Sequence, residues 1–167
     1  MIQKQVLSPH FCLDEFTKSS TAIKHGIQNN PPQEAVENLK RLCQGSLEPL
    51  REELGLPMVI TSGFRTKTLN DLLAHSSERS QHMQGQAADF YVAPGQSGLS
   101  RRELLIKAFR LIITSEQIDY DQLILYPSFI HVSYVSRERN RRSILLGMRN
   151  GKLGYGKCSV QNALKIQ

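Results

Sequence analysis

The spacing of apolar residues changes once along the chain, and this change limits the folds that it can adopt. Between residues 33 and 54 apolar side chains recur every three or four positions, which is the spacing of one helix face. They are Val36, Leu39, Leu42, Cys43, Leu47, Leu50 and Leu54. Beyond residue 120 they alternate or run together, as in "DQLILY" and "FIHVSYV", which indicates a hairpin of two strands. Early helices and a late hairpin predict an α+β fold, with helices packed on a mostly antiparallel sheet.

Pro49 interrupts the first helical pattern. Either the helix kinks at this proline, or Ser46 caps a second helix just before it. Gly55 is expected to end the helix. The remaining expected elements are a strand at 58–61, a helix at about 67–75, a strand in "GQAADFYV", a helix at about 101–115 capped by Ser100, and a strand in "SILLGMRN" that ends in a turn at Asn150-Gly151.

Length and composition favour one domain over residues 1–167. Residues 1–32 are expected to form an ordered N-terminal arm with a short helix at about 13–18, and residues from about 152 to 167 a loosely attached tail. No apolar run approaches the roughly 18 residues that cross a bilayer, and the first residues lack the apolar segment of a secretory signal. We therefore expect no membrane insertion, and a protein that is cytoplasmic as synthesised.

Cysteine and charge usage exclude further classes. Cys12, Cys43 and Cys158 are widely spaced and form no CxxC pair, which argues against a disulfide framework or a cysteine zinc site. The net charge is +6, with a cluster "RERNRR" at 137–142. This cluster lacks the interleaved aromatic residues of a nucleic-acid site, so no nucleic-acid partner is expected. It fits either a solvated loop or attraction to an anionic polymer such as bacterial cell wall.

The stretch "SQHMQGQAADF" carries two candidate metal ligands. A catalytic zinc ion takes three protein ligands, which are histidine nitrogens, carboxylate oxygens or thiolates. His82 and Asp89 are two such groups, Gly85 allows the backbone to turn between them, and His131 in the later hairpin is a candidate third. Each has another explanation, since His131 could be a hydrogen-bonded core residue and Asp89 could pair with Arg65 without any metal.

Three segments together resemble the peptidase M15 family: "TSGFRTKTLN", "SQHMQGQAADF" and "DQLILYPSFIHVSY". The family pattern SGxR…N…SxHxxGxAxD…HxS is met by Ser62, Gly63, Arg65, Asn70, Ser80, His82, Gly85, Ala87, Asp89, His131 and Ser133. The family includes zinc D-Ala-D-Ala carboxypeptidases, dipeptidases and phage peptidoglycan endopeptidases, and it shares its fold with the hedgehog amino-terminal domain. The resemblance runs from about residue 57 to residue 134, and the preceding segments look like a phage or prophage branch.

The resemblance implies a role for each matching residue. His82, Asp89 and His131 would be the ligands of a zinc ion (Zn²⁺). Arg65 would hold the substrate or polarise its carbonyl, and its planar fork suits a terminal carboxylate. Ser80 would order the loop beside His82 and contact substrate. Ser133 would support the site from the second shell of residues, and Asn70 would be a packing contact.

The residue that should move the proton is missing from the pattern. Related enzymes carry a glutamate or aspartate shortly before the last histidine, but here Tyr126 takes roughly that place. Tyr126 and Glu78 are the candidate replacements, although a tyrosine of ordinary pKa is a poor base at neutral pH.

Three functions therefore compete. The first is a zinc metallopeptidase that cleaves amide bonds of peptidoglycan peptides, as a D-Ala-D-Ala carboxypeptidase or a cell-wall endopeptidase. The second is a zinc-binding, catalytically weak module that binds cell-wall peptide. The third is a basic structural or nucleic-acid protein with accidental metal-like residues. We favour the first, as a monomer that reaches the cell wall by phage-type release.

Overall fold

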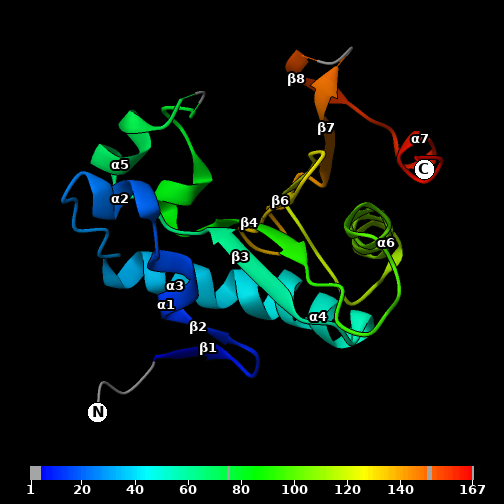
Figure 1. Ribbon diagram of the computed structural model, residues 1–167, viewed down its shortest axis with the longest axis horizontal. Coiled ribbons are helices and arrows are strands. Elements are labelled where there is room, and N and C mark those ends of the chain that lie inside the picture. The colour runs from blue at the N-terminus through cyan, green and yellow to red at the C-terminus, as the bar shows by residue number, and fades with distance from the viewer. Residues whose placement is uncertain (1–4, 75, 150–151, 167) are drawn as a thin grey trace.

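The structure is a computed structural model that describes residues 5–74, 76–149 and 152–166 (Figure 1). Its elements are, in order, β1 (Val6–Ser8), β2 (Phe11–Cys12), α1 (Leu13–Thr17), α2 (Ser20–Lys24), α3 (Gln33–Leu42), the π-helical η1 (Cys43–Leu47), α4 (Glu48–Leu54), β3 (Met58–Ser62), α5 (Lys67–Leu72), the 3₁₀-helical η2 (Gln81–Gln84), β4 (Ala87–Val92), α6 (Arg101–Thr114), β5 (Gln122–Leu125), β6 (Ile130–Ser133), β7 (Ser143–Arg149), β8 (Lys152–Lys157) and α7 (Val160–Ala163). The α+β class is confirmed. The likeness to the hedgehog fold stays a prediction.

The six-stranded sheet has the order β3-β4-β6-β5-β7-β8 and is mixed, so the prediction of a mostly antiparallel sheet was wrong. The cause is β7, which lies parallel to β5 with Gln122 opposite Ser143. After β6 the chain does not turn back in a hairpin. It passes the end of β5 and re-enters on the other side, where Ser143 N donates to Asp121 O at 2.9 Å.

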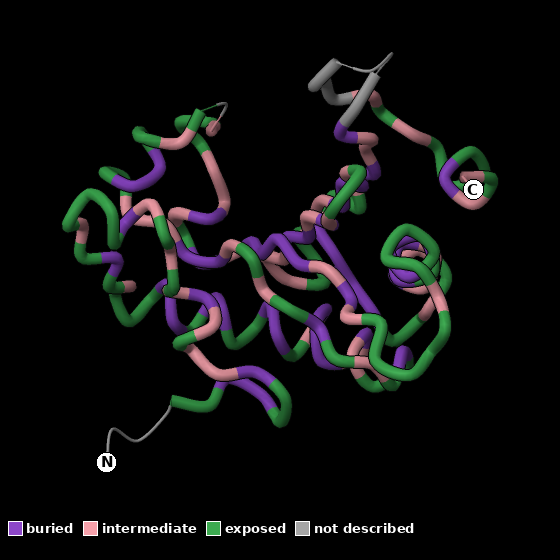
Figure 2. Tube along the Cα trace, in the orientation of Figure 1, coloured by how far each residue is buried: buried purple, intermediate pink, exposed green. Residues whose placement is uncertain are grey.

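One face of the sheet packs in the core, and the other face lines a pocket. Residues alternate between faces along a strand, and one face joins the buried core through Ala88, Phe90, Ile130, Val132, Leu123 and Leu125. The helices α3, α4 and α6 supply the other side of this core, and Figure 2 shows the buried stretches gathered in the central strands and neighbouring helices. The alternate residues Asp89, Ile124 and His131 face away from that core and line a pocket.

A single long helical path from α3 to α4 answers the question that Pro49 raises. The alternative of a cap at Ser46 is not formed, since its hydroxyl donates to the carbonyl oxygen of Asp119. A proline has no N–H and its ring crowds the carbonyl four residues earlier. Here the π-helical turn η1 precedes Pro49, and the freed Gly45 O accepts from Asp119 N at 3.0 Å. Gly55 ends α4 with a φ of 64°, as predicted.

The N-terminal arm is ordered and attached to the long helix. Ser8 Oγ donates to Glu48 Oε2 at 2.5 Å, and His10 contacts the same carboxylate through its backbone N–H and its ring. The helix expected at about 13–18 is α1. Among the described residues, no helix is long and apolar enough to cross a membrane.

The segment after residue 151 is more ordered than the expected tail. β8 pairs with β7, and Ala163 of α7 is fully buried. Arg110 Nη2 on α6 donates to Ile166 O at 2.7 Å, which ties the end of the described chain to the core. The strand expected in "SILLGMRN" is β7, while the turn at Asn150-Gly151 lies outside the described residues.

Candidate metal centre

Strand pairing places two of the three predicted ligands together. Asp89 on β4 lies directly opposite His131 on β6, so both side chains project from the same face of the sheet. On the other side of β4, Ser62 of β3 lies opposite Asp89. The third predicted ligand, His82, comes from η2, which precedes β4.

Gly85 makes the short connection between η2 and β4 possible. Its φ is 68°, in the left-handed region, and a Cβ there would lie 2.3 Å from Ala35 O. Only glycine therefore fits both the backbone conformation and the contact with α3. The predicted turn lets His82 fold back over Asp89.

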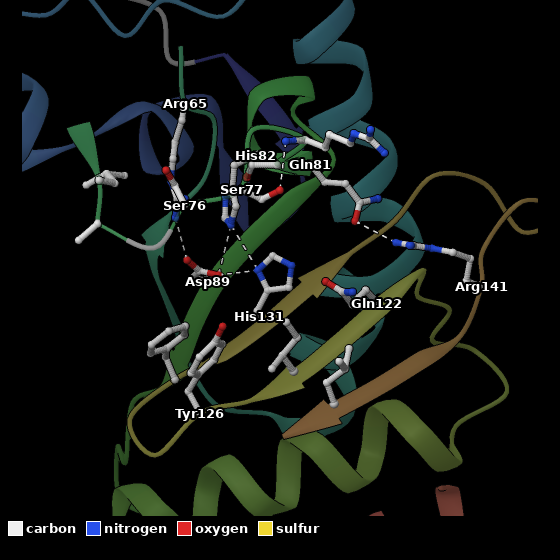
Figure 3. Close-up of a pocket in the computed structure, with 17 residues that line it drawn as sticks. Arg65, Ser76, Ser77, Gln81, His82, Asp89, Gln122, Tyr126, His131 and Arg141 are labelled. Carbon is white, nitrogen blue, oxygen red and sulfur yellow. Dashed lines mark hydrogen bonds and ion pairs between the residues drawn. The ribbon is translucent and has the colours of Figure 1, made fainter. Parts of the chain in front are cut away.

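The three side chains converge on one point (Figure 3). His82 Nε2 lies 3.4 Å from Asp89 Oδ1 and 3.3 Å from His131 Nδ1, and His131 Nδ1 lies 2.8 Å from the same Oδ1. Ligands about 2.0–2.1 Å from a tetrahedral zinc ion are about 3.3 Å apart. Two of the three separations match those of a zinc ligand set, and the third, between His131 Nδ1 and Asp89 Oδ1, has the length of a hydrogen bond.

Hydrogen bonding at His82 also fits a cation. His82 Nδ1 lies 2.7 Å from the carbonyl oxygen of Gly63, which accepts only, so Nδ1 carries the proton. Burial lowers the pKa of His82 and favours its neutral form, which leaves a lone pair on Nε2. This lone pair faces Asp89 Oδ1. Burial alone would raise the pKa of Asp89, but its contacts with His82 and His131 outweigh burial and hold it ionised. The Nε2 lone pair and the ionised carboxylate are both suited to bind a zinc ion.

Arg65 contacts the opposite oxygen of Asp89. Its Nη2 lies 3.1 Å from Oδ2, and its Nε and Nη2 donate to Ser62 Oγ at 2.9 and 2.8 Å. The ion pair considered as an alternative from the sequence is thus present, yet it leaves Oδ1 directed at the two histidines. The backbone N–H of Arg65 also donates to His82 O at 3.2 Å. Arg65 therefore fixes the carboxylate and the loop that carries His82.

The cluster forms one wall of a pocket of about 720 Å³. Tyr126 lies beside it, stacked on Phe129 with ring centroids 4.3 Å apart. A Cβ on Gly147 would lie 2.3 Å from the Tyr126 ring, so this glycine leaves the space that the ring occupies. Glu78 is exposed and is not among the described residues that line the pocket.

Comparison with known families adds to this geometry. The family model described as Peptidase M15 matches residues 9–133, more than half of the chain. The chain belongs to the peptidase M15 family. No curated protein sequence matches it significantly. Peptidases of the M15 family are zinc-dependent, and the match reaches much farther toward the N-terminus than the resemblance seen from the motifs.

Three other residues of the M15 pattern, Ser80, Ser133 and Asn70, have different surroundings. Ser80 lines the pocket and its backbone caps η2, but its hydroxyl makes no cap bond. Ser133 Oγ is fully buried and accepts from Gln122 N at 3.1 Å. Asn70 is buried and its Nδ2 donates to Ser77 O at 3.0 Å, which agrees with a packing contact.

Sequence reasoning missed the other side of the pocket in this M15 chain. Gln81 and Arg141 line it, and both bind the buried carboxylate of Asp121. Arg141 belongs to the "RERNRR" cluster, which the sequence explained only as a solvated loop or as a site of attraction to an anionic polymer. The acid partner lies 20 residues earlier, and the pair becomes visible only when β7 is placed beside β5.

Proposed function

We propose that the chain is a zinc-dependent peptidase that hydrolyses amide bonds in peptidoglycan peptides. One observation carries this: three donor atoms, from His82, Asp89 and His131, lie 2.8–3.4 Å apart at a pocket wall in a peptidase M15 chain. A bound zinc ion would supply a water of lowered pKa and would polarise the scissile carbonyl.

The chain's own groups supply binding and orientation. Gly63 O holds His82 in one tautomer, and Arg65 holds Asp89 with Oδ1 toward the cluster. Tyr126 lies where its hydroxyl could donate to a developing oxyanion, a contribution made by fixed donors in many hydrolases. Both D-Ala-D-Ala carboxypeptidase and endopeptidase action use such a centre, and action at the cell wall after phage-type release is part of the proposal.

A second candidate is a zinc-binding module that recognises cell-wall peptide and hydrolyses it weakly. The observation in its favour is the small number of carboxylates that line the pocket. Among the described residues that line the pocket, Asp89 is the one carboxylate, and it is already committed to the cluster and to Arg65. A separate carboxylate that takes the proton from water is therefore lacking at this wall.

Metal content and product analysis decide between these functions. We expect purified protein to hold one zinc ion by elemental analysis, His82→Ala to lose it, and the exposed His25→Ala to keep it. Mass spectrometry of digested peptidoglycan should show a new amine that is absent with Asp89→Ala. Zinc-loaded protein that binds peptide but releases no amine would favour the binding module, and wild-type protein without metal affinity would exclude both.

Two variants test the proton carrier. If Tyr126 assists, Tyr126→Phe should lower turnover of peptidoglycan peptide while zinc content stays unchanged. Glu78→Gln serves as the comparison, because this side chain is exposed outside the pocket lining. Unchanged turnover in both variants would exclude both residues.

A further inference from the structure

The wall of the pocket that faces Arg65 is formed by Arg141. This residue immediately precedes Arg142 and strand β7, and its side chain is 60% exposed. Figure 3 shows Arg65 and Arg141 entering from opposite sides, with the ligand cluster between them. Arg141 is therefore placed to contact a substrate that crosses the metal centre.

A buried acid fixes the Arg141 guanidinium. The Asp121 side chain is 2% exposed, and its Oδ1 accepts from Arg141 N and Nε, both at 2.9 Å. Its Oδ2 accepts from Arg141 Nη2 at 2.5 Å and from Gln81 Nε2 at 2.9 Å. Because one edge of the guanidinium is held, its plane and direction are set before any ligand arrives.

The remaining Nη1/Nη2 edge of the guanidinium is only weakly engaged. Nη2 reaches Gln81 Oε1 at 3.5 Å, and Nη1 makes no hydrogen bond within the described part of the chain. A guanidinium edge presents two parallel N–H groups, which match the two oxygens of a carboxylate. The neutralising partner, Asp121, lies behind the arginine and does not line the pocket.

The charge of the pocket agrees with an anionic ligand. The described lining includes the three guanidinium groups of Arg65, Arg79 and Arg141, against the single carboxylate of Asp89. Asp89 is already paired with Arg65. With Asp121 behind Arg141, two carboxylates oppose three guanidinium groups, and the one surplus positive charge favours anionic substrates in a concave site.

We propose that Arg141 binds a free carboxylate of the substrate peptide and makes this chain selective for acidic peptides. The inference rests on the proposed function and names its substrate class. In a peptidoglycan stem peptide the carboxylate has two sources, the C-terminus and the free carboxyl of the D-glutamate residue. Both offer the same planar pair of oxygens.

Arg142 provides a matched control. Its Nε donates to Oδ1 of another buried acid, Asp119, at 3.1 Å, and its side chain is 67% exposed. It does not line the pocket. Like Arg141→Gln, Arg142→Gln removes one positive charge and leaves a buried acid without its arginine partner. It does so outside the proposed contact with substrate.

The test is calorimetric binding of three synthetic peptides to metal-free and zinc-loaded protein. The first is L-Ala-γ-D-Glu-L-Lys-D-Ala-D-Ala, and the other two carry an amide at the C-terminus or at the D-glutamate carboxyl. One amidation should weaken binding to wild-type protein about 10- to 100-fold, the loss expected for a charged hydrogen-bonded contact. Arg141→Gln should bind the acid peptide about 10- to 100-fold more weakly than wild-type protein does, and should bind the amidated peptide with unchanged affinity. Arg142→Gln should keep the wild-type preference for the acid peptide.

Several outcomes would overturn the proposal. The first is that wild-type protein does not bind the acid peptide, and the second is that neither amidation weakens its binding. The third is that Arg141→Gln keeps the full preference for the acid peptide and has a native circular dichroism spectrum. If Arg141→Gln does not fold, Arg141→Lys keeps the charge and should retain only part of the preference; a full preference would again contradict the idea. A retained preference in zinc-loaded protein that cleaves no peptide would overturn the peptidase function and leave this inference standing.

Discussion

Asp89 combines two contacts on its two oxygens. Oδ1 faces the histidine nitrogens, while Oδ2 and the neighbouring Ser62 hold Arg65. A side chain that orients a ligand commonly changes metal affinity or activity about 10- to 100-fold when it is replaced. The effect of Arg65 should therefore extend beyond substrate contact.

Arg65→Lys separates these effects. A lysine ammonium keeps the charge but cannot span Ser62 and Asp89 with a rigid fork. We expect one bound zinc ion to remain, and kcat/KM on peptidoglycan peptide to fall about 10- to 100-fold. Elemental analysis and peptide turnover measure the two quantities. Loss of zinc in this variant would mean that Arg65 acts mainly by holding Asp89.

At this scale the sequence predicted which three side chains cluster but not the whole pocket. His82 and Asp89 share one short motif, and an apolar strand around His131 predicts its place in the sheet. The pairing of Asp121 with Arg141 depends on a parallel strand contact, which no local pattern encodes.

At the scale of elements, the turn between η2 and β4 is the most constrained connection beside the metal centre. Gly85 and Gly26 have similar φ angles, 68° and 63°, but only Gly85 is packed against another chain segment. A comparison of the two sites therefore separates backbone conformation from close contact.

Gly85→Ala should lower the free energy of unfolding by about 2–5 kcal/mol, from the left-handed conformation and from the clash with Ala35 O. Gly26→Ala should cost about 1–2 kcal/mol, because no atom lies within 4 Å of its added Cβ. Urea unfolding measures both. Equal losses would show that the α3 contact adjusts freely.

Glu48 attaches the N-terminal arm to the long helix. Burial raises the pKa of this carboxyl, but hydrogen bonds from His10 and Ser8 outweigh burial and lower it below its ordinary value of 4.5. Because the folded state favours the ionised form, Glu48 stabilises the fold above about pH 4.5, and this contribution is lost as the pH falls through the lower folded value.

Glu48→Gln should therefore reduce the free energy of unfolding by about 1–3 kcal/mol at pH 7. The difference from wild-type protein should shrink as the pH drops below 4.5. Urea unfolding of both proteins at several pH values measures this difference. The other acids titrate alike in the two proteins, so their contribution cancels. A difference that does not change with pH would contradict the assigned cause.

At the scale of the whole molecule, the sequence predicted the class and failed at the C-terminal end. Helical spacing and the hairpin pattern indicate α+β without reference to tertiary contacts. The expected tail instead supplies β8, which pairs with the strand directly before it, and α7, whose Ala163 is buried. The family match likewise ends at residue 133, although the fold continues.

Removal of residues 136–167 should abolish cooperative unfolding. It exposes the edge of β5 and leaves the buried acids Asp119 and Asp121 without their arginine partners, a costly change for buried charges. Removal of residues 159–167 deletes α7 only, and should leave a cooperative but less stable protein. Thermal unfolding followed by circular dichroism measures both, and a cooperative transition in the shorter chain would refute the expectation.

The crossover between β6 and β7 lies outside the segment that matches the family. The predicted metal ligands lie inside the segment that the family shares, whereas Arg141 lies in the crossover beyond it. Mutation or recombination in this crossover could therefore alter which peptide is accepted while the hydrolytic centre is left intact. Residues 134–142 could therefore be exchanged between related chains, by evolution or by design, to vary the accepted peptide.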